Sequence, residues 1–289
     1  MSELTNQDIS VVVCTKNSIS GISACLTSLR EAEVGQLIVV DANSTDGTRE
    51  IAEKLADLVL DDPGIGLGNA RNVGIRETTK PLILNMGSDN VMPEGELQKM
   101  IAYLVKGDYE GVSAQTQIVG SDFCSKGLNA WRAGRFSQGK RTVIGTPTLF
   151  LGDLMREKPY DPSRKFSDDS ELCERWATEF NARFAISDAC VQEIGKTSWK
   201  EIRVRARMYG VSDHEIFTQN SGQWTLRRKT KSLTHPFKVD FLTPARHLRL
   251  RQTPSAIPFL GVFTALRYAG WLSSFVARSR NPDSSDKSN

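Results

Sequence analysis

Four short apolar runs near the start of the chain limit the folds that this sequence can adopt. They lie at Ile9–Cys14, Leu37–Val40, Leu58–Leu60 and Leu82–Met86. Each run is short, continuous and rich in branched side chains, which is typical of strands buried on both faces in a parallel sheet. Segments with helical spacing separate the runs, such as the one that ends near Arg30. This alternation predicts βαβ units and an α/β fold with a mostly parallel sheet.

The fourth run ends in the small polar loop Gly87-Ser88-Asp89-Asn90, and Pro93 follows it. A strand that ends in such a loop places a carboxylate at the carboxyl edge of a sheet, where open α/β sheets bind their ligands. The Asp89 carboxylate there could hold a divalent cation. These residue types also favour an ordinary turn, so the loop alone does not distinguish a site from a turn.

The second half of the chain is less regular. The pattern predicts helices at Gly95–Val105, from Phe166 to about Thr178, and at Ile202–Tyr209, and strands at Gly111–Ile118 and Arg183–Ile186. The stretch Cys124–Thr146 has no clear period. Within it we expect Trp131, Arg132 and Arg135 to form a surface that faces a ligand.

A basic segment and two uncharged segments end the chain. Arg227 to Arg251 contains eight Lys or Arg residues and one acid, Asp240. Fifteen uncharged residues (Gln252–Leu266) and ten more (Tyr268–Ala277) flank Arg267. Neither piece reaches the ~20 apolar residues that a membrane-spanning helix needs. The adjacent basic and aromatic apolar blocks favour a segment at a membrane interface; the alternative is a helix packed on the domain or on a second subunit.

Composition limits the partners and the compartment. The net charge is only +3, and the basic segment holds few aromatic residues for base stacking, so we expect no nucleic-acid partner. Five scattered cysteines without CxxC spacing indicate a reduced, cytosolic compartment and no zinc site. The N-terminus carries Glu3 and Asp8 and no apolar stretch, so no signal peptide is expected.

Five motifs occur in one order along the chain. They are ISVVVCTKN, LIVVDANSTDGTREIA, GLGNARNVGI, LILNMGSDN and FSDDSELCERW. This ordered set, from about Ile9 to Trp176, resembles the family 2 glycosyltransferases with the GT-A fold. The resemblance implies a Rossmann-like, mostly parallel mixed sheet flanked by helices in residues 1–235. Beyond this domain, we expect residues 236–280 to form a helical, membrane-interfacial segment and residues 281–289 to form a disordered tail.

The resemblance also implies a nucleotide-sugar donor and places it on six residues: Thr15, Asn17, Asp41, Arg71, Ser88 and Asp89. Thr15 and Asn17 match the positions where the first strand of the family meets the nucleoside. Asp41 matches the acid that contacts the base or the ribose. Arg71 matches a residue that lines the same pocket.

The metal and the catalytic base follow from two further motifs of the family. Its Asp-x-Asp metal motif is reduced here, because Gly87 occupies the first position and Asp89 remains, which implies Mn²⁺ or Mg²⁺ on Asp89. His235 or His214 is the second ligand that we consider. Asp168 and Asp169 stand at the family's acidic pair, whose second member is the catalytic base. A cation offsets the charge of a diphosphate, and a carboxylate accepts the acceptor's proton.

The predicted function is therefore the inverting transfer of a sugar from a nucleotide diphosphate to a hydroxyl of a glycan or a lipid-linked acceptor. One displacement with one base inverts the sugar carbon. Two alternatives stay open: a polyprenyl-phosphate sugar synthase, whose acceptor needs little base help, and a non-catalytic nucleotide-sugar binder. We expect a cytoplasmic enzyme of polysaccharide biosynthesis, peripheral at the inner face of the cell membrane. Homodimer formation is left open.

Overall fold

The computed structural model describes residues 4–163, 168–195, 197–248 and 256–280. The chain divides into two compact units. The first, here called the sheet unit, comprises Met1–Val119 and Phe136–Gly195; the second, the helical unit, comprises Gly120–Arg135 and Lys196–Asn289. The domain boundary predicted after residue 235 falls inside the helical unit. The roles expected on its two sides, a glycosyltransferase domain before it and a membrane-interfacial segment after it, remain predictions. The tail predicted at 281–289 lies outside the described residues.

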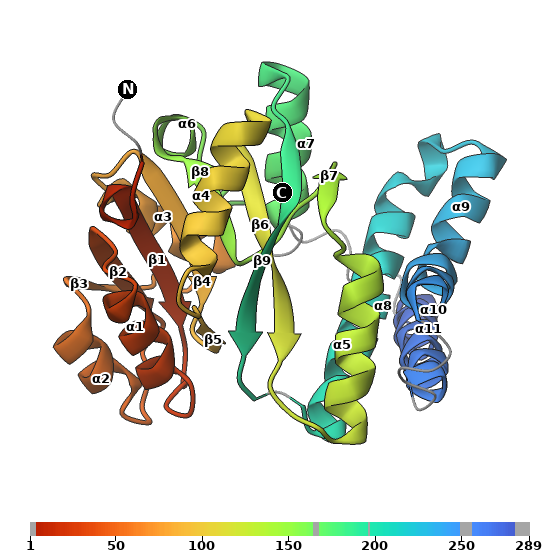
Figure 1. Ribbon diagram of the computed structural model, residues 1–289. Coiled ribbons are helices and arrows are strands. Elements are labelled where there is room, and N and C mark those ends of the chain that lie inside the picture. The colour runs from red at the N-terminus through yellow and green to blue at the C-terminus, as the bar shows by residue number, and fades with distance from the viewer. Residues whose placement is uncertain (1–3, 164–167, 196, 249–255, 281–289) are drawn as a thin grey trace. The chain divides into compact units, whose positions relative to one another are not determined.

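The first half of the sheet unit alternates strands and helices as predicted (Figure 1). Its elements are η1 (Asn6–Asp8), β1 (Ile9–Thr15), α1 (Ile22–Glu31), β2 (Gln36–Asp41), α2 (Thr48–Leu55), β3 (Leu58–Asp61), α3 (Leu67–Arg76) and β4 (Leu82–Gly87). The other half contains β5 (Asn90–Val91), α4 (Glu96–Gly107), β6 (Gly111–Ile118), β7 (Gly139–Arg141), β8 (Thr148–Leu151), α6 (Gly152–Glu157), α7 (Asp168–Phe180) and β9 (Phe184–Glu193).

The strands of the sheet unit join in one mixed sheet with the order β3-β2-β1-β4-β8-β6-β9-β5, and β7 pairs with β9. Its first part is parallel, with Val11 of β1 opposite Leu37 of β2 and Leu84 of β4. β8, which the sequence pattern did not identify, lies between β4 and β6 and is antiparallel to both. The parallel half with mixed pairing beyond it confirms the predicted sheet class.

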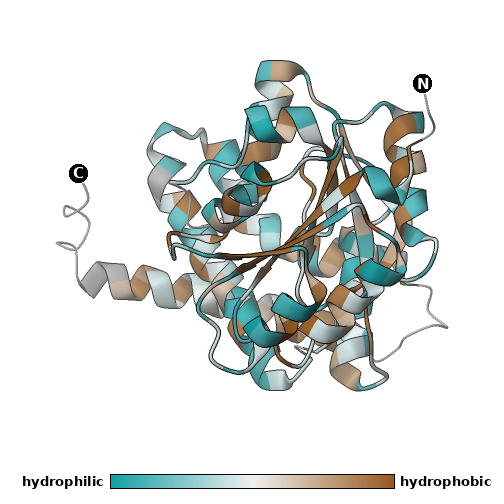
Figure 2. Ribbon diagram, turned by 90° about the vertical axis from the view of Figure 1, so that its left-hand side faces the viewer, coloured by the Kyte–Doolittle hydropathy of each residue, from teal (hydrophilic) through white to brown (hydrophobic). Residues whose placement is uncertain are grey.

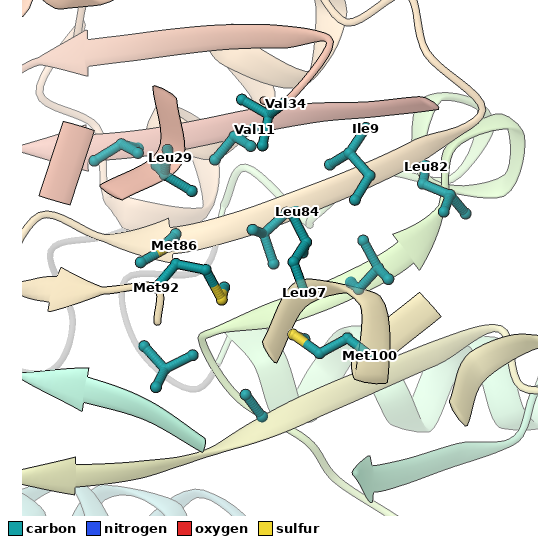
Figure 3. Packing of buried hydrophobic residues seen from close by; sticks show 14 of the residues in the cluster. Ile9, Val11, Leu29, Val34, Leu82, Leu84, Met86, Met92, Leu97 and Met100 are labelled. Carbon is teal, nitrogen blue, oxygen red and sulfur yellow. The ribbon is translucent and has the colours of Figure 1, made fainter. Parts of the chain in front are cut away.

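Both faces of the sheet are buried. Successive strand residues point to opposite faces, so Val11 packs with residues of α1, α2 and α4, whereas Val12 packs with residues of α3, α6 and α7. Figure 3 shows Leu29, Leu97 and Met100 packed against the strands on the first of these faces. Figure 2 shows that hydrophobic residues concentrate along the strands. A sheet covered on both sides explains why its apolar runs are continuous rather than alternating.

The helical unit contains α5 (Phe123–Arg135), α8 (Trp199–Asn220), η2 (Ser221–Gln223), α9 (Leu226–Pro236), the π-helical segment η3 (Phe237–Leu242), α10 (Thr243–His247) and α11 (Ala256–Arg280). Helices α8 and α11 pack with their backbones in contact at two glycines. A Cβ on Gly210 would lie 1.9 Å from the carbonyl oxygen of Arg267, and a Cβ on Gly270 would lie 2.2 Å from that of Arg207. Only glycine permits this approach.

The expected ligand-facing surface of Trp131, Arg132 and Arg135 is wrong. These residues lie on α5, where Trp131 and Arg132 are buried within the helical unit. The Trp131 indole Nε1 donates to Asp240 Oδ1 at 2.9 Å, and Arg135 Nη1 donates to the same oxygen at 2.7 Å. The Trp131 ring also packs 5.1 Å from the ring of Phe263. Trp131 and Arg135 therefore connect α5 to η3 of the helical unit.

Candidate functional site

The predicted donor residues gather at one edge of the sheet. β1, β2 and β4 are parallel, so they end on the same side, with Thr15 opposite Asp41 and Cys14 opposite Gly87. Ser88 and Asp89 follow directly on β4. The carboxyl edge of such a sheet is where ligands of open α/β folds bind.

Asp41 is fully buried, and its charge is compensated locally. Its Oδ1 accepts a 2.5 Å hydrogen bond from Ser44 Oγ, and its Oδ2 accepts from the Ser44 backbone nitrogen at 3.0 Å. Asn17, in the left-handed region with φ of 48°, accepts from the Thr45 nitrogen at 2.9 Å. Asn17 and Asp41 thus fix the shape of the loop after β2, which forms a rim of this edge.

Thr15 carries a buried hydroxyl at the end of β1. Its Oγ1 has no hydrogen-bond partner among the described residues. A buried hydroxyl without a partner is costly, and a ligand or water that enters the edge could supply one. This observation fits the predicted contact between Thr15 and the nucleoside.

The loop after β4 is built around a glycine. A Cβ on Gly87 would lie 2.9 Å from Asp89 Oδ1 and 2.9 Å from Asn90 Oδ1, so these side chains occupy the space of a first acid. Ser88 Oγ donates to Ser18 Oγ at 2.9 Å, and the Ile194 nitrogen donates to the Asp89 carbonyl at 2.8 Å. Gly87, which replaces the first acid of the Asp-x-Asp motif, therefore leaves the space that the Asp89 and Asn90 side chains fill.

The Asp89 side chain fits a magnesium-type site with a single protein carboxylate. It is partly exposed, and the described residues contain no group of three or more His, Cys, Asp or Glu that could enclose a metal. Mg²⁺ commonly takes one or two carboxylates and completes its shell with substrate phosphates and water. The two histidines considered as second ligands lie in the helical unit, where His214 Nδ1 pairs with Ser274 Oγ at 2.9 Å and its ring packs edge-on against Trp271.

The predicted acidic pair meets the predicted pocket arginine. Arg71 Nη1, on α3, lies 2.7 Å from Asp168 Oδ2 and 2.9 Å from Asp169 Oδ1, at the start of α7. Its Nη2 donates to Thr146 Oγ1 at 2.6 Å. The side chain of Arg71 is 7% exposed, that of Asp168 13% and that of Asp169 26%. Asp169 is thus the more accessible carboxylate of the pair.

Tyr160 is the site residue that sequence reasoning missed, because Tyr160-Asp161-Pro162 has the pattern of a turn. Its buried ring lies 5.1 Å from the Arg71 guanidinium, its hydroxyl donates to Asp169 Oδ1 at 3.3 Å, and Asn85 Nδ2 donates to that hydroxyl at 3.2 Å. Asn72 holds the backbone of Tyr160 from both sides, at 2.7 and 3.0 Å. One signal in the sequence could have pointed to Tyr160. It is the polar residue Asn72, which lies next to Arg71 in an otherwise packed helix.

The electrostatics favour a charged arginine and a basic carboxylate. Burial raises the pKa of Asp169, against the opposing influence of the Arg71 charge, and the neighbouring Asp168 raises it further. Burial lowers the pKa of Arg71, but the Asp169 and Asp168 carboxylates outweigh it, and the net pKa lies above its ordinary value. A carboxylate with a raised pKa accepts protons more readily, which is a property that a general base needs.

Residues 10–156 match the family model described as Glycosyl transferase family 2. The match covers half of the chain, and the chain belongs to this family. The match includes the carboxyl edge of the sheet with Thr15, Asp41 and Asp89, and it ends before Asp168 and Asp169. Membership of the family therefore rests on the residues from β1 to β8. The role predicted for Asp168 and Asp169 depends on their own geometry.

Curated relatives match the chain over short stretches. An uncharacterized glycosyltransferase of Mycobacterium tuberculosis is 31% identical over 99 residues, which cover 34% of this chain and 44% of that protein. An uncharacterized glycosyltransferase of Rickettsia bellii is 34% identical over 104 residues, 36% of this chain and 35% of that protein. A dolichyl-phosphate hexose transferase of Haloferax volcanii is 28% identical over 123 residues, 42% and 54% of the two chains. The chain thus spans about half or less of the length of these relatives.

Solved structures share the fold over 70% to 95% of this chain. S. aureus TarS 1–349 in complex with UDP-GlcNAc has a TM-score of 0.52 at 17% identity, covering 95% of this chain and 92% of TarS 1–349. A mycobacterial protein has a TM-score of 0.50 at 18% identity, covering 70% and 73% of the two chains. This likeness confirms the predicted GT-A fold.

Proposed function

We propose that this protein transfers a sugar, with inversion, from a nucleotide diphosphate to a hydroxyl of a glycan or a lipid-linked acceptor. The observation that carries the proposal is the placement of Asp169. It is a partly exposed carboxylate with a raised pKa, held by Arg71 and Tyr160. The resemblance of the motif around Asp168 and Asp169 to the family's acidic pair also supports this role.

The proposed step moves one proton and one glycosyl group. Asp169 accepts the proton of the acceptor hydroxyl as the acceptor oxygen bonds to the anomeric carbon. The bond between that carbon and the diphosphate oxygen breaks, and its electron pair leaves with the nucleoside diphosphate. Attack opposite to the leaving group inverts the sugar carbon.

The donor is proposed to bind along the carboxyl edge of the sheet. Thr15, Asn17 and Asp41 would contact the nucleoside, while Ser88 and Asp89 would lie at the diphosphate. Asp89 would hold Mn²⁺ or Mg²⁺, which offsets the charge of the diphosphate. Arg71 was predicted to line this pocket, and its ion pairs with Asp168 and Asp169 give it a second role, because they fix the orientation of the base.

Tyr160 is proposed as a positioning residue for the base. Both hydrogen bonds recorded for the Asp169 carboxylate, from Arg71 and Tyr160, fall on Oδ1. Among the described residues Oδ2 accepts none, so Oδ2 is the oxygen assigned to receive the proton. A carboxylate fixed through one oxygen presents the other in a defined direction, which is how positioned groups accelerate proton transfer.

A phosphate acceptor is the second candidate, and one relative favours it. The Haloferax volcanii relative bears the name dolichyl-phosphate hexose transferase. A phosphate acceptor is already anionic and needs no base, so in that case Arg71, Asp168 and Asp169 would serve structure alone. The product identifies the acceptor. Transfer to a hydroxyl of a neutral sugar supports the reaction with a hydroxyl acceptor, and transfer only to a polyprenyl phosphate supports the second candidate.

A ligand screen tests the donor site directly. Nucleoside diphosphates and nucleotide sugars should raise the melting temperature of the full chain, because a ligand of the folded state stabilises it by mass action. The shift should grow with Mn²⁺. Anomeric assignment of the transferred sugar by NMR should then show the configuration opposite to that of the donor, and a retained configuration would contradict inversion.

We also propose that the protein works in the cytoplasm, at the inner face of the cell membrane. The scattered cysteines support the cytoplasmic compartment, and the basic and apolar residues of the helical unit support the membrane contact.

A further inference from the structure

Helix α11 resembles a membrane span in composition but is packed as part of the protein. Among the described helices, the segment Ala256–Ala277 alone is long and apolar enough to cross a membrane. Its single charge, Arg267, is buried. Nε and Nη2 bind Asp213 at 2.7 and 2.9 Å, and Nη1 binds Asp240 at 2.7 Å. A span would separate this charge from its partners, so α11 belongs to the helical unit.

Helix α9 carries an apolar stripe on its exposed side. Leu226 is 80% exposed, Leu233 42% and Phe237 45%. They are seven and four residues apart, which places them on one face over three helical turns. Exposed apolar side chains that repeat along one helix face can mark a surface that meets another molecule or a membrane.

Basic residues border this stripe, and no acid is near it in the sequence. Arg227, Lys231 and Lys238 are exposed on one side of the stripe, and Lys229 lies on the other. Residues 216–239 contain no Asp or Glu, and Asp240 is fully buried. Within the segment 216–239 the stripe is therefore bordered by basic and neutral residues alone.

The backbone beneath the stripe is fixed. Tyr268 Oη of α11 donates to the Leu233 carbonyl at 2.8 Å. Asp240 of η3 accepts hydrogen bonds from Trp131, Arg135 and Arg267. A fixed backbone presents the three apolar side chains without further ordering, which lowers the entropy cost of binding.

We propose that Leu226, Leu233 and Phe237 of α9 and η3, with Arg227, Lys229, Lys231 and Lys238, form a docking surface for an anionic lipid bilayer. The apolar side chains enter the boundary between headgroups and acyl chains, and the basic side chains contact the anionic headgroups. The surface belongs to the helical unit and does not depend on the chemistry assigned to the sheet unit.

Charge and side-chain chemistry favour lipid over the other occupants. A symmetric contact between two copies would bring the same face of each together, so the basic residues of the two copies would meet, and residues 216–239 offer no acid to pair them. A nucleic acid would suit the charge but would leave Leu226 and Leu233 in water, because bases bind by stacking on aromatic rings. An anionic bilayer satisfies both the stripe and its border.

Vesicle flotation of the full chain tests the surface. The protein should float with phosphatidylcholine vesicles that contain roughly one third phosphatidylglycerol, and not with phosphatidylcholine alone. Arg227→Gln/Lys231→Gln/Lys238→Gln should weaken binding about a hundredfold, since each basic residue contributes about fivefold. Leu226→Gln/Leu233→Gln should abolish flotation. The matched control Val105→Gln/Lys106→Gln changes an exposed apolar and a basic residue of α4 and should float like the unchanged protein.

Three outcomes would overturn the proposal. The first is flotation of Leu226→Gln/Leu233→Gln equal to that of the unchanged protein, and the second is absence of flotation of the unchanged protein with anionic vesicles. The third is a dimer, seen by light scattering, that Leu226→Gln/Leu233→Gln converts to a monomer, which would assign the face to a second copy. Nucleotide-induced thermal shifts of the same variants report on the sheet unit separately, so failure of docking and failure of the donor site are distinguishable.

Discussion

The guanidinium of Arg71 and the carboxylate of Asp169 lie 2.9 Å apart, although 98 positions separate them in the chain. Arg71 comes from α3 and Asp169 from the start of α7. The same guanidinium nitrogen contacts Asp168 at 2.7 Å. The orientation of the acidic pair is therefore set by a residue outside the acidic motif, and each part of this cluster makes a separate prediction.

Asp169→Asn should leave donor affinity close to that of the unchanged protein and lower turnover ~10²- to 10⁴-fold, because a general base contributes about that much. The amide keeps the shape of the carboxylate and cannot take a proton. Donor binding by calorimetry and initial rates with a hydroxyl acceptor measure the two effects. Asp168→Asn is the matched control and should cost less. Full turnover in Asp169→Asn would instead favour the phosphate-acceptor reaction.

Tyr160→Phe should move the acidic limb of the pH–rate profile to higher pH. The Tyr160 hydroxyl bonds to the charged form of Asp169 and so lowers the pKa of that carboxyl, opposing burial, which raises it. Without that bond the pKa rises, and a higher pH is needed to keep the base ionised. Initial rates across pH measure the limb.

The control for this prediction is Tyr103→Phe, which changes a tyrosine stacked on Tyr109. It should leave the limb in place. A Tyr160→Phe enzyme with lower stability and an unchanged limb would assign Tyr160 a structural role alone.

Asp89→Ala should remove the Mn²⁺-dependence of nucleoside diphosphate binding. Asp89 is the single acid of the loop after β4, so no neighbouring loop carboxylate replaces it. Calorimetry with Mn²⁺ and with EDTA gives the comparison, and Asp188→Ala on β9, an exposed acid, should behave like the unchanged protein. Equal binding with EDTA and with Mn²⁺ in the unchanged protein would refute the metal site.

Asp240→Asn should destabilise the helical unit by about 3–5 kcal/mol, because it leaves buried cations without their anion. Asp240 is fully buried and binds Arg135 and Arg267 at 2.7 Å. Urea unfolding followed by tryptophan fluorescence measures the change, since Trp131 bonds to the same carboxylate. Asp153→Asn, which breaks the solvent-exposed pair with Arg156, should have little effect.

The sequence alone determined the parallel half of the sheet and the edge where the donor is proposed to bind. Strands buried on both faces are mostly apolar along their whole length, so the runs at Ile9–Cys14 and Leu82–Met86 are visible without any tertiary information. Parallel strands end on one side, which places Thr15, Asp41 and Asp89 at one edge as soon as the strands are identified. These features depend on local composition and on chain direction.

Only the tertiary structure decided which distant residues meet. Tyr160 joins Asn85 to Asp169 because α7 and the segment before it pack over α3 and β4, and no local pattern records that contact. Arg267 interrupts an apolar segment in the sequence, yet Asp213 and Asp240 neutralise it inside the helical unit. A buried charge is tolerated only where its partners are also buried, and the partners come from other helices.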